Sequence, residues 1–217
     1  PLPFVGQKRM LAKEFMKVLE QYPDGTLFVD LFGGSGLLSH ITKSLKPHST
    51  VIYNDFDNYR FRMKHIPQTN QLLADIREMV GNSVPRHKII KGELRERIFS
   101  RIEQEENSTG YVDFITLSSS ILFSMKYKLS VQDMRKEALY NNIRKTGYPE
   151  CTDYLEGLEI VSCDYKEVFN RYKDIPGVVF LVDPPYLSTD VGTYNMYWNM
   201  ADYLDVLNLS LIHISEP

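Results

Sequence analysis

The sequence has few of the features that would place a chain in a membrane or in an oxidising compartment. It contains only two cysteines, Cys151 and Cys163, and their spacing is not that of a metal site. We therefore expect free thiols, a reducing, cytoplasmic environment and no bound metal. No apolar run approaches the roughly 18 residues that a membrane span requires, and we find no signal-peptide pattern.

The sequence also lacks a large excess of charge of either sign. The formal net charge is −3, which by itself gives no sign of nucleic-acid binding. The charges are nevertheless uneven, because residues 60–150 hold 16 Lys and Arg against 11 Asp and Glu, whereas the rest of the chain holds 9 against 17. A mildly basic middle region is compatible with contact to phosphate groups. A solvated helical face has the same composition, so both interpretations stay open.

The chain also lacks the third glycine of the dinucleotide-binding fingerprint. Gly33-Gly34-Ser35-Gly36 follows a buried apolar run, but Leu38 and Ser39 come next. This order counts against a pyrophosphate-binding NAD site. The turn still lets the backbone approach a ligand closely and opens a helix N-terminus toward it. A plain tight turn is the alternative.

What the chain does contain is an alternation of short apolar runs and helical patterns. The apolar runs predict strands at residues 26–32, 51–53, 158–164 and 178–182, and helical spacing predicts helices at 11–19, 37–45 and 165–172. Strands that alternate with helices indicate a parallel sheet covered on both faces, which is a Rossmann-like α/β fold.

Residues 66–157 interrupt this alternation and are too many for a simple crossover. They comprise a predicted helix at 71–80, a charged segment at 88–106, a stretch at 111–127 rich in Phe, Ile and Ser, and a helix-like run at 131–145. We expect a mostly helical inserted subdomain, with residues 1–65 and 158–208 forming the discontinuous sheet domain. The latter ends in a helix at about 200–208.

Both ends of the sequence look cut. The chain starts Pro1-Leu2-Pro3, and its tail from Leu209 to Pro217 resembles the translation of a transposase-end sequencing adapter. We therefore leave residues 209–217 out of the fold prediction, as an engineered scar would be. A genuine amphipathic strand is the alternative.

Acidic residues follow three of the predicted strands. Asp55 comes about 20 residues after the glycines, where a carboxylate can accept hydrogen bonds from ribose hydroxyls. The alternative is that Asp55 or Asp57 caps the next helix. Asp164 can accept a hydrogen bond from an adenine amino group, and a turn aspartate is its alternative.

The third acidic position belongs to Asp183-Pro184-Pro185-Tyr186, directly after the apolar run 178–182. Each proline biases the preceding residue away from helix, and Pro185 has no N–H to continue a strand. Asp183 and Tyr186 are thus expected to project into a crevice at the carboxyl edge of the sheet, where open α/β sheets bind ligands. A planar base with an exocyclic amino group suits such a pocket. A turn capped by Asp with a packing Tyr is the alternative.

Taken in order, these motifs resemble those of the D12 class, or Dam-like, DNA adenine-N6 methyltransferases. The resemblance covers nearly all of residues 3–208, and this chain departs from the family in having little after the last motif. The segments that carry it are Pro3-Phe4-Val5-Gly6-Gln7-Lys8-Arg9, Asp30-Leu31-Phe32-Gly33-Gly34-Ser35-Gly36, Asn54-Asp55 and Asp183-Pro184-Pro185-Tyr186.

The resemblance implies that S-adenosylmethionine is the cofactor and double-stranded DNA the substrate, bound by a monomer without a membrane. The residues implied to bind the cofactor are Phe32, Gly34 and Gly36 at its methionine and ribose, Asp30 near its amino group, Asp55 at the ribose, Asp164 at the adenine, Asp183, and the pocket-closing Phe4, Gly6 and Lys8. An exposed lysine at a helix start is the alternative for Lys8.

The catalytic residues implied by the resemblance are Asp183, Pro184, Pro185 and Tyr186. The Asp183 carboxylate and the Pro184 carbonyl would each accept an N6–H bond from a flipped adenine, and Tyr186 would stack on its ring. The insert, residues 66–157, would recognise DNA. Its candidate phosphate contacts are Arg86, Lys88, Lys91, Arg95, Arg97, Arg101, Lys126, Lys128, Arg135, Lys136, Arg144 and Lys145, the last six near Tyr127, Tyr140 and Tyr148.

Two other functions stay open. One keeps the cofactor but methylates cytosine N4 or an RNA adenine, and the other is a catalytically silent nucleic-acid or nucleotide-binding module. We expect the complete protein to be an active, site-specific adenine DNA methyltransferase of a modification system. Relatives in the family continue past the last motif with further strands that complete the sheet. The present chain, C-terminally truncated, is expected to be poorly stable or inactive, since its half-sheet exposes an apolar edge.

Overall fold

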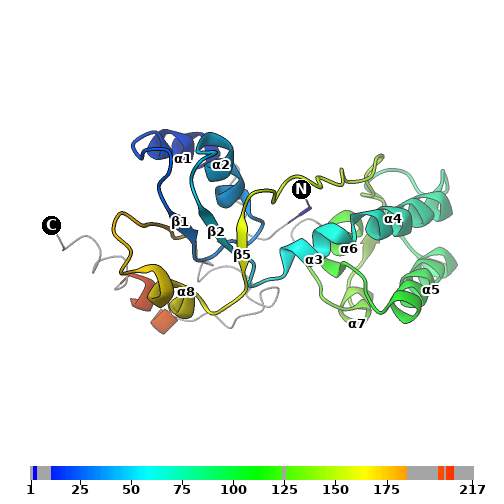
Figure 1. Ribbon diagram of the computed structural model, residues 1–217. Coiled ribbons are helices and arrows are strands. Elements are labelled where there is room, and N and C mark those ends of the chain that lie inside the picture. The colour runs from blue at the N-terminus through cyan, green and yellow to red at the C-terminus, as the bar shows by residue number, and fades with distance from the viewer. Residues whose placement is uncertain (1, 4–10, 124–125, 185–199, 203, 208–217) are drawn as a thin grey trace. The chain divides into compact units, whose positions relative to one another are not determined.

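The computed structural model describes residues 2–3, 11–123, 126–184, 200–202 and 204–207 (Figure 1). The chain divides into two compact units. We call residues 4–60 and 152–217 the sheet unit and residues 1–3 and 61–151 the insert unit. Each unit has its own core of buried side chains.

The sheet unit is built on four parallel strands in the order β5-β2-β1-β6. They are β1 (Phe28–Asp30), β2 (Val51–Asn54), β5 (Glu159–Val161) and β6 (Val179–Leu181). In the register of the sheet, Asp30 lies beside Tyr53 on one side and Leu181 on the other. The prediction of an α/β fold with a parallel, Rossmann-like sheet is therefore confirmed.

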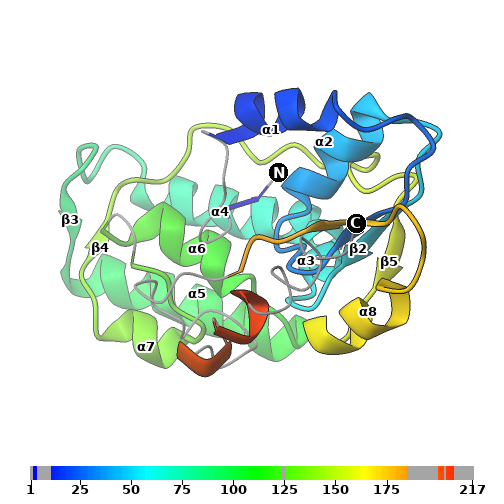
Figure 2. The same cartoon turned by 90° about the vertical axis from the view of Figure 1, so that its left-hand side faces the viewer.

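Helices cover both faces of this sheet, as Figures 1 and 2 show. α1 (Ala12–Leu19) and α2 (Leu37–Leu45) lie together on one face and α8 (Tyr165–Tyr172) on the other. Successive strand residues alternate between the two layers, because side chains along a strand point to opposite faces. Phe28 packs with Leu19 on the α1 face, and Val29 packs with Val168 on the α8 face.

The insert unit is mostly helical. Its helices are the end of α3 (Tyr59–Lys64), α4 (Ile66–Val80), α5 (Gly92–Thr109), α6 (Phe114–Ile121) and α7 (Val131–Arg135). Their core holds fully or nearly fully buried Leu72, Ile76, Ile98, Phe99, Ile102 and Leu117. Pro67 stands in the first turn of α4, where its missing N–H leaves no helical hydrogen bond unmade.

Two predicted elements of the insert were wrong in extent. The helix-like run 131–145 is helical only as α7, which Ser130 caps by accepting a hydrogen bond from Asp133 N. Beyond it, β4 (Leu139–Tyr140) pairs antiparallel with β3 (Ile89–Ile90), so tertiary pairing overrides the helical pattern. The helix predicted at 71–80 begins earlier, at Ile66.

The last predicted helix is partly described. Residues 200–202 and 204–207 have helical backbone, and Val206 is buried against the α8 face of the sheet. Asn208 and the adapter-like tail 209–217 lie outside the described residues.

A buried ion pair lies in the core of the insert unit. Arg62 Nε donates to both carboxylate oxygens of Asp113 at 3.2 Å. Its Nη2 donates to the Pro3 carbonyl at 2.9 Å and to Thr116 Oγ1 at 3.1 Å. Leu2, the neighbour of Pro3, is fully buried. These contacts hold residues 2–3 in the insert unit, directly before the segment 4–10 of the sheet unit.

Candidate active site

The candidate site lies at the carboxyl edge of β1 and β6. The chain runs from β1 to β2 on one side, whereas β6 is added on the other side of β1. Strand order therefore reverses between β1 and β6, and such a switch point is where open α/β sheets bind ligands. Asp30 closes β1, and Asp183 follows two residues after Leu181, the partner of Asp30 in the ladder.

The glycine-rich turn connects β1 to α2 at this edge. Gly36 N donates to Gly33 O at 2.7 Å, which makes the turn tight, and Gly36 has a φ of 71° in the left-handed region. A Cβ at Gly36 would lie 2.8 Å from Leu155 Cδ2, and one at Gly33 would lie 2.3 Å from the Tyr53 ring. Side chains are thus excluded from the turn by conformation and by packing.

Asp30 is a buried carboxyl group with an unusual pKa. It is 1% exposed, and Ser39 Oγ donates to its Oδ2 at 2.7 Å, while Oδ1 receives no hydrogen bond from any described residue. Burial and, to a smaller extent, the negative charge of Asp183 together raise the pKa of Asp30 to about 7, although the Ser39 hydroxyl and the backbone N–H groups of Phe32 and Ser39 act in the opposite direction. A cationic ligand group at Oδ1 would favour the ionised carboxylate.

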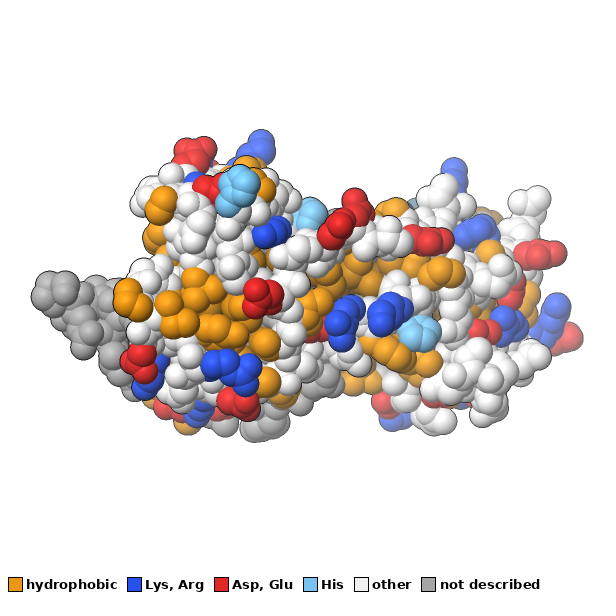
Figure 3. Space-filling model, in the orientation of Figure 1, with side chains coloured by type: hydrophobic (Ala, Val, Ile, Leu, Met, Phe, Trp, Pro, Cys, Tyr) orange, Lys and Arg blue, Asp and Glu red, His pale blue; other side chains and the backbone are white. Residues whose placement is uncertain are grey.

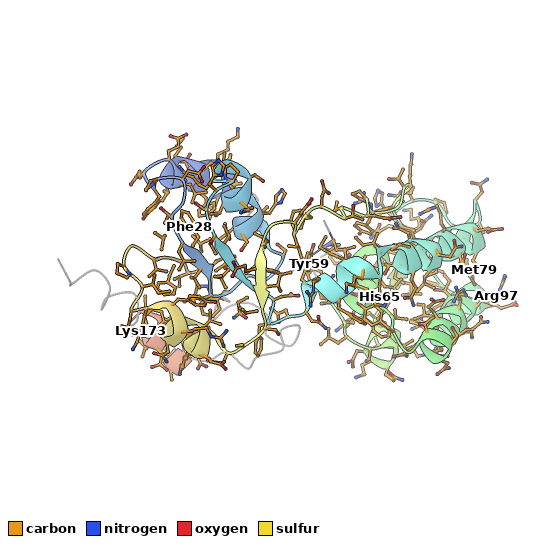
Figure 4. All side chains as sticks on the ribbon, viewed as in Figure 1. Phe28, Tyr59, His65, Met79, Arg97 and Lys173 are labelled. Carbon is orange, nitrogen blue, oxygen red and sulfur yellow. The ribbon has the colours of Figure 1, made fainter. Side chains whose placement is uncertain are left out.

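Asp55 caps a helix from the end of β2. Its Oδ1 accepts from Tyr59 N at 2.6 Å and its Oδ2 from Arg60 N at 3.1 Å, so the capping interpretation is the one observed (Tyr59 is labelled in Figure 4). The Tyr53 hydroxyl also reaches Oδ1, at 3.1 Å. Burial raises the pKa of Asp55. Oδ2 keeps one lone pair for a ligand, because each carboxylate oxygen has about two acceptor sites.

Asp164 caps α8 after β5. Its Oδ1 accepts from Lys166 N at 2.8 Å, and the residue is exposed to solvent. The turn interpretation is again the observed one, since Asp164 is the N-cap residue of α8. A contact between Asp164 and adenine stays a prediction.

Asn54, which the sequence analysis did not identify as a site residue, ties the strand ends together. Its Nδ2 donates to Leu31 O at 3.0 Å and to Cys163 O at 2.9 Å, and its Oδ1 accepts from Cys163 N at 3.1 Å. The side chain is 1% exposed. Asn54 thus fixes the backbone directly before Asp164. A polar residue ending an otherwise apolar buried strand is the signal that marks it in the sequence.

The chain returning from the insert is fastened to α2. His40 Nδ1 donates to Tyr154 O at 2.8 Å, and the two rings stack with centroids 4.4 Å apart. Leu155 packs against Gly36, and Lys43 packs against Gly157. Residues 154–157 therefore cover the start of α2 and the end of the glycine turn.

The last motif is described only in part. Asp183 and Pro184 are half-buried at the end of β6, and Phe32 lies beside Tyr165 with ring centroids 5.0 Å apart. Pro185 and Tyr186 lie outside the described residues, as do Phe4, Gly6 and Lys8. The structure thus brings together Asp30, the glycine turn and Asp183, with Asp55 at the end of the neighbouring strand.

Half of the basic candidates in the insert unit are engaged in ion pairs. Arg101 pairs with Asp75 and Glu105, and Lys126 and Lys128 both pair with Glu137. Arg95, Arg135 and Lys136 also have acidic partners. Figure 3 shows the result, with acidic and basic side chains interspersed over this unit.

The other basic candidates form no ion pair within the described residues. Lys88 and Lys91 flank β3, and Arg97 and Lys145 lie on α5 and after β4. Arg86 donates to the Ile143 carbonyl, and Arg144 lies over the Tyr148 ring at 4.3 Å. Tyr148 itself is 7% exposed, so its ring belongs to the core rather than to a base-stacking surface.

Within the described residues, no group of three or more His, Cys, Asp or Glu side chains is arranged to hold a metal ion. Among the same residues, no helix combines the length and the apolar character needed to cross a bilayer.

Comparison with known proteins agrees with the motif order. The model of the D12 class N6 adenine-specific DNA methyltransferase family matches residues 4–206. A protein of Haemophilus influenzae (strain KW20/Rd) named "Putative methyltransferase" is 39% identical over 216 residues, covering 97% of this chain and 72% of that protein. The resemblance noted from the motifs is thereby confirmed. This chain belongs to the D12 class of N6 adenine-specific DNA methyltransferases.

Proposed function

We propose that this protein transfers a methyl group from S-adenosylmethionine to N6 of a flipped adenine in double-stranded DNA, as part of a modification system. The observation that carries the proposal is the meeting of Asp183, the glycine turn and buried Asp30 at the switch point of the sheet. A donor pocket and an acceptor pocket then share one edge. Methyl transfer between two bound reactants requires that proximity.

The cofactor half of the site suits a ligand with both a cationic and a ribose end. Oδ1 of Asp30 is buried and receives no hydrogen bond from the described residues. A positively charged amino group of the ligand would supply that hydrogen bond. The glycine turn lets the backbone approach the ligand, and Oδ2 of Asp55 retains an acceptor site for a ribose hydroxyl. S-adenosylmethionine supplies an electrophilic methyl group on a sulfonium centre.

The acceptor half is the Asp183-Pro184 pair. The N6 lone pair of adenine is delocalised into the ring and is a poor nucleophile. If the Asp183 carboxylate and the Pro184 carbonyl each accept one N6–H bond, the nitrogen becomes pyramidal and its lone pair points at the donor. Holding both reactants in line is worth roughly 7–11 kcal/mol in favourable cases. Neither a metal nor a covalent intermediate with the protein is needed for these contacts.

DNA contact is assigned to the insert unit. Unstacking the target base costs about a few kcal/mol, which contacts to the phosphate backbone must offset. The basic residues flanking β3, Lys88 and Lys91, form no ion pair within the described residues, and they are exposed and close together in the chain. Lys126 and Lys128 are already neutralised by Glu137.

The test is methyl transfer from isotope-labelled S-adenosylmethionine into unmethylated DNA and, in a parallel reaction, into RNA, each followed by nucleoside analysis. Label in N6-methyladenine supports the proposal, label in N4-methylcytosine or in RNA replaces it with the corresponding alternative, and DNA binding without transfer favours the silent module. Asp183→Ala should reduce turnover at least 100-fold, the lower end of what a positioned catalytic group contributes. Asp174→Ala, an exposed substitution in the same unit, serves as control.

A further inference from the structure

Tyr53 connects the glycine turn to Asp55, and the motifs do not predict this connection. The residue is fully buried at the third position of β2, between the two cofactor elements named above. Its hydroxyl lies 2.8 Å from the Gly34 carbonyl and 3.1 Å from Asp55 Oδ1. One side chain thus contacts the turn that follows β1 and the carboxylate that follows β2.

The hydroxyl is a permanent donor. Burial raises the pKa of Tyr53 far above its usual value, and the negative charge of Asp55 raises it further, so the proton stays on the oxygen at any physiological pH. A tyrosine hydroxyl has a single proton, which two acceptors share here. The shorter contact is to Gly34 O, and Asp55 Oδ1 also accepts from Tyr59 N.

The contact to Gly34 sets the orientation of a peptide group. In a planar trans peptide the C=O and the following N–H point in opposite directions. With the Gly34 carbonyl bound to Tyr53, the N–H of Ser35 is directed away from the Tyr53 side chain. The ring also packs under Gly33, where a Cβ would lie 2.3 Å from Cδ2 and Cε2. Tyr53 therefore packs against the turn at Gly33 and fixes the orientation of the peptide group between Gly34 and Ser35.

The contact to Asp55 sets the orientation of the carboxylate. Oδ1 is occupied by Tyr53 and Tyr59, so the remaining acceptor site is on Oδ2. Without the Tyr53 hydroxyl, one of the three hydrogen bonds that orient the carboxylate would be lost, and Oδ1 would keep only the Tyr59 N–H. The hydroxyl thus helps to keep Oδ1 occupied and Oδ2 directed toward a ligand.

We infer that Tyr53 is a positioning residue for the cofactor, holding the glycine turn and the Asp55 carboxylate in the geometry that grips the ribose. This inference rests on the proposed function, because it assigns Tyr53 to the same cofactor pocket. Tyr53 itself contacts no ligand in this scheme. Its effect passes through Gly34 and Asp55.

The experiment measures binding of S-adenosylhomocysteine by calorimetry, without DNA, to the wild type and to Tyr53→Phe. This substitution keeps the ring under Gly33 and removes only the hydroxyl. We expect the dissociation constant to rise about tenfold, equivalent to about 1.4 kcal/mol. DNA affinity should change by less than about twofold, because the insert unit is untouched.

A second ligand separates positioning from general loosening. S-adenosylhomocysteine lacking the ribose 2′ and 3′ hydroxyls cannot bond to Asp55. If Tyr53 acts through Asp55, Tyr53→Phe should weaken this analogue by less than about threefold. The control is Tyr22→Phe, because Tyr22 packs edge-on against Phe28 away from the turn and should leave both ligands within about twofold.

Each outcome decides the inference. Equal weakening of both ligands, or unchanged binding of S-adenosylhomocysteine by Tyr53→Phe, overturns it. If wild-type protein that circular dichroism shows to be folded fails to bind S-adenosylhomocysteine, the proposed function itself is wrong, which is a separate result. Circular dichroism checks folding. Should Tyr53→Phe not fold, Asp55→Asn decides, since the inference requires that variant to lose the preference for the ribose hydroxyls, and a retained preference contradicts it.

Discussion

Asp30 shows how burial changes the chemistry of a single residue in this protein. The sequence places an aspartate at the end of an apolar strand, and the structure buries it beside Ser39 with Asp183 close enough to raise its pKa. A carboxyl group with a pKa of about 7 is only partly ionised at neutral pH. The pocket therefore gains its negative charge most fully when a cationic group is bound.

The first prediction concerns stability and pH in Asp30→Asn. Because the folded pKa of Asp30 is raised from 3.8 to about 7, its contribution to stability is complete below pH 3.8 and is lost as pH rises through 7. Removing the ionisable group should stabilise the unliganded protein at pH 8 by on the order of 4 kcal/mol at most, and little at pH 4. Urea unfolding at both pH values measures this.

The matched control for Asp30 is Asp174→Asn, an exposed substitution in the same unit. It should show no such difference between pH 4 and pH 8. If Asp30→Asn were less stable than the wild type at pH 8, burial would not be the dominant effect on that carboxyl group.

A second prediction at this scale is that Asn54→Ala destabilises the sheet unit by about 3 kcal/mol. The substitution leaves Leu31 O and both backbone groups of Cys163 without their side-chain partner, and each buried unsatisfied group costs about 1–3 kcal/mol. Chemical denaturation gives the value. Ser44→Ala, which removes an exposed helix hydroxyl, should change stability by less than about 0.5 kcal/mol. Comparable losses in the two variants would contradict the assigned role.

At the scale of elements, the site is assembled where strands stop. Gly36 and Asp164 are the N-cap residues of α2 and α8, and Asp55 accepts hydrogen bonds from the first two N–H groups of α3, so these candidate residues also hold helix N-termini. The capping interpretations and the ligand interpretations are compatible, because a carboxylate that caps a helix still has free acceptor sites. The end of a strand and the start of a helix place these groups at one edge.

The third prediction separates the two roles of Asp164 on α8. Asp164→Ala should destabilise the fold by about 1 kcal/mol through loss of the cap, whereas Asp164→Asn should retain stability because asparagine caps helices equally well. Thermal unfolding measures both variants. If both variants are equally unstable, the cap assignment fails, whatever their affinity for S-adenosylhomocysteine.

Much of the element pattern was predictable, and its failures are informative. Helices α2 and α8 have the predicted bounds, since their apolar spacing is local and strong glycine or aspartate signals precede them. The antiparallel pair of β3 and β4 was missed because its strands have two residues each and lie about 50 residues apart in the chain. Such pairing depends on the surrounding core, for which periodicity carries no information.

At the scale of the whole molecule, the chain divides its charges between two units. The basic surplus of residues 60–150 falls almost entirely in the insert unit, and the acidic residues proposed to bind the cofactor fall in the sheet unit. We therefore expect cofactor binding and DNA binding to respond to different substitutions.

The fourth prediction tests this division with Lys88→Ala combined with Lys91→Ala. Neither lysine forms an ion pair within the described residues, so both are available to phosphates. The double variant should lower the magnitude of the slope of log affinity for DNA against log salt by up to about 2, and leave cofactor affinity unchanged. Fluorescence anisotropy across a salt series measures the slope.

The control is Lys126→Ala with Lys128→Ala, which removes two lysines already paired with Glu137. Its slope should change less than that of the Lys88 and Lys91 variant. A larger change in the control would assign DNA contact to the other basic cluster.

By itself, the sequence determined the parallel α/β arrangement and the residues that end its strands. Apolar runs, helical spacing and turn glycines are local properties of the sequence. Parallel strands bring their carboxyl ends to one edge of the sheet, independently of how the rest of the chain folds. Gly34, Asp55 and Asp183 could therefore be selected as candidate site residues before any coordinates. The order of those motifs was also sufficient to indicate the family.

Only the tertiary structure decided how these groups are held. The raised pKa of Asp30, the bridge from Tyr53 to Gly34, and the fastening of the strand ends by Asn54 depend on burial and on partners up to 109 positions away. Desolvation and hydrogen bonding act through distance in space, and that distance is set by packing of the whole chain rather than by neighbouring residues.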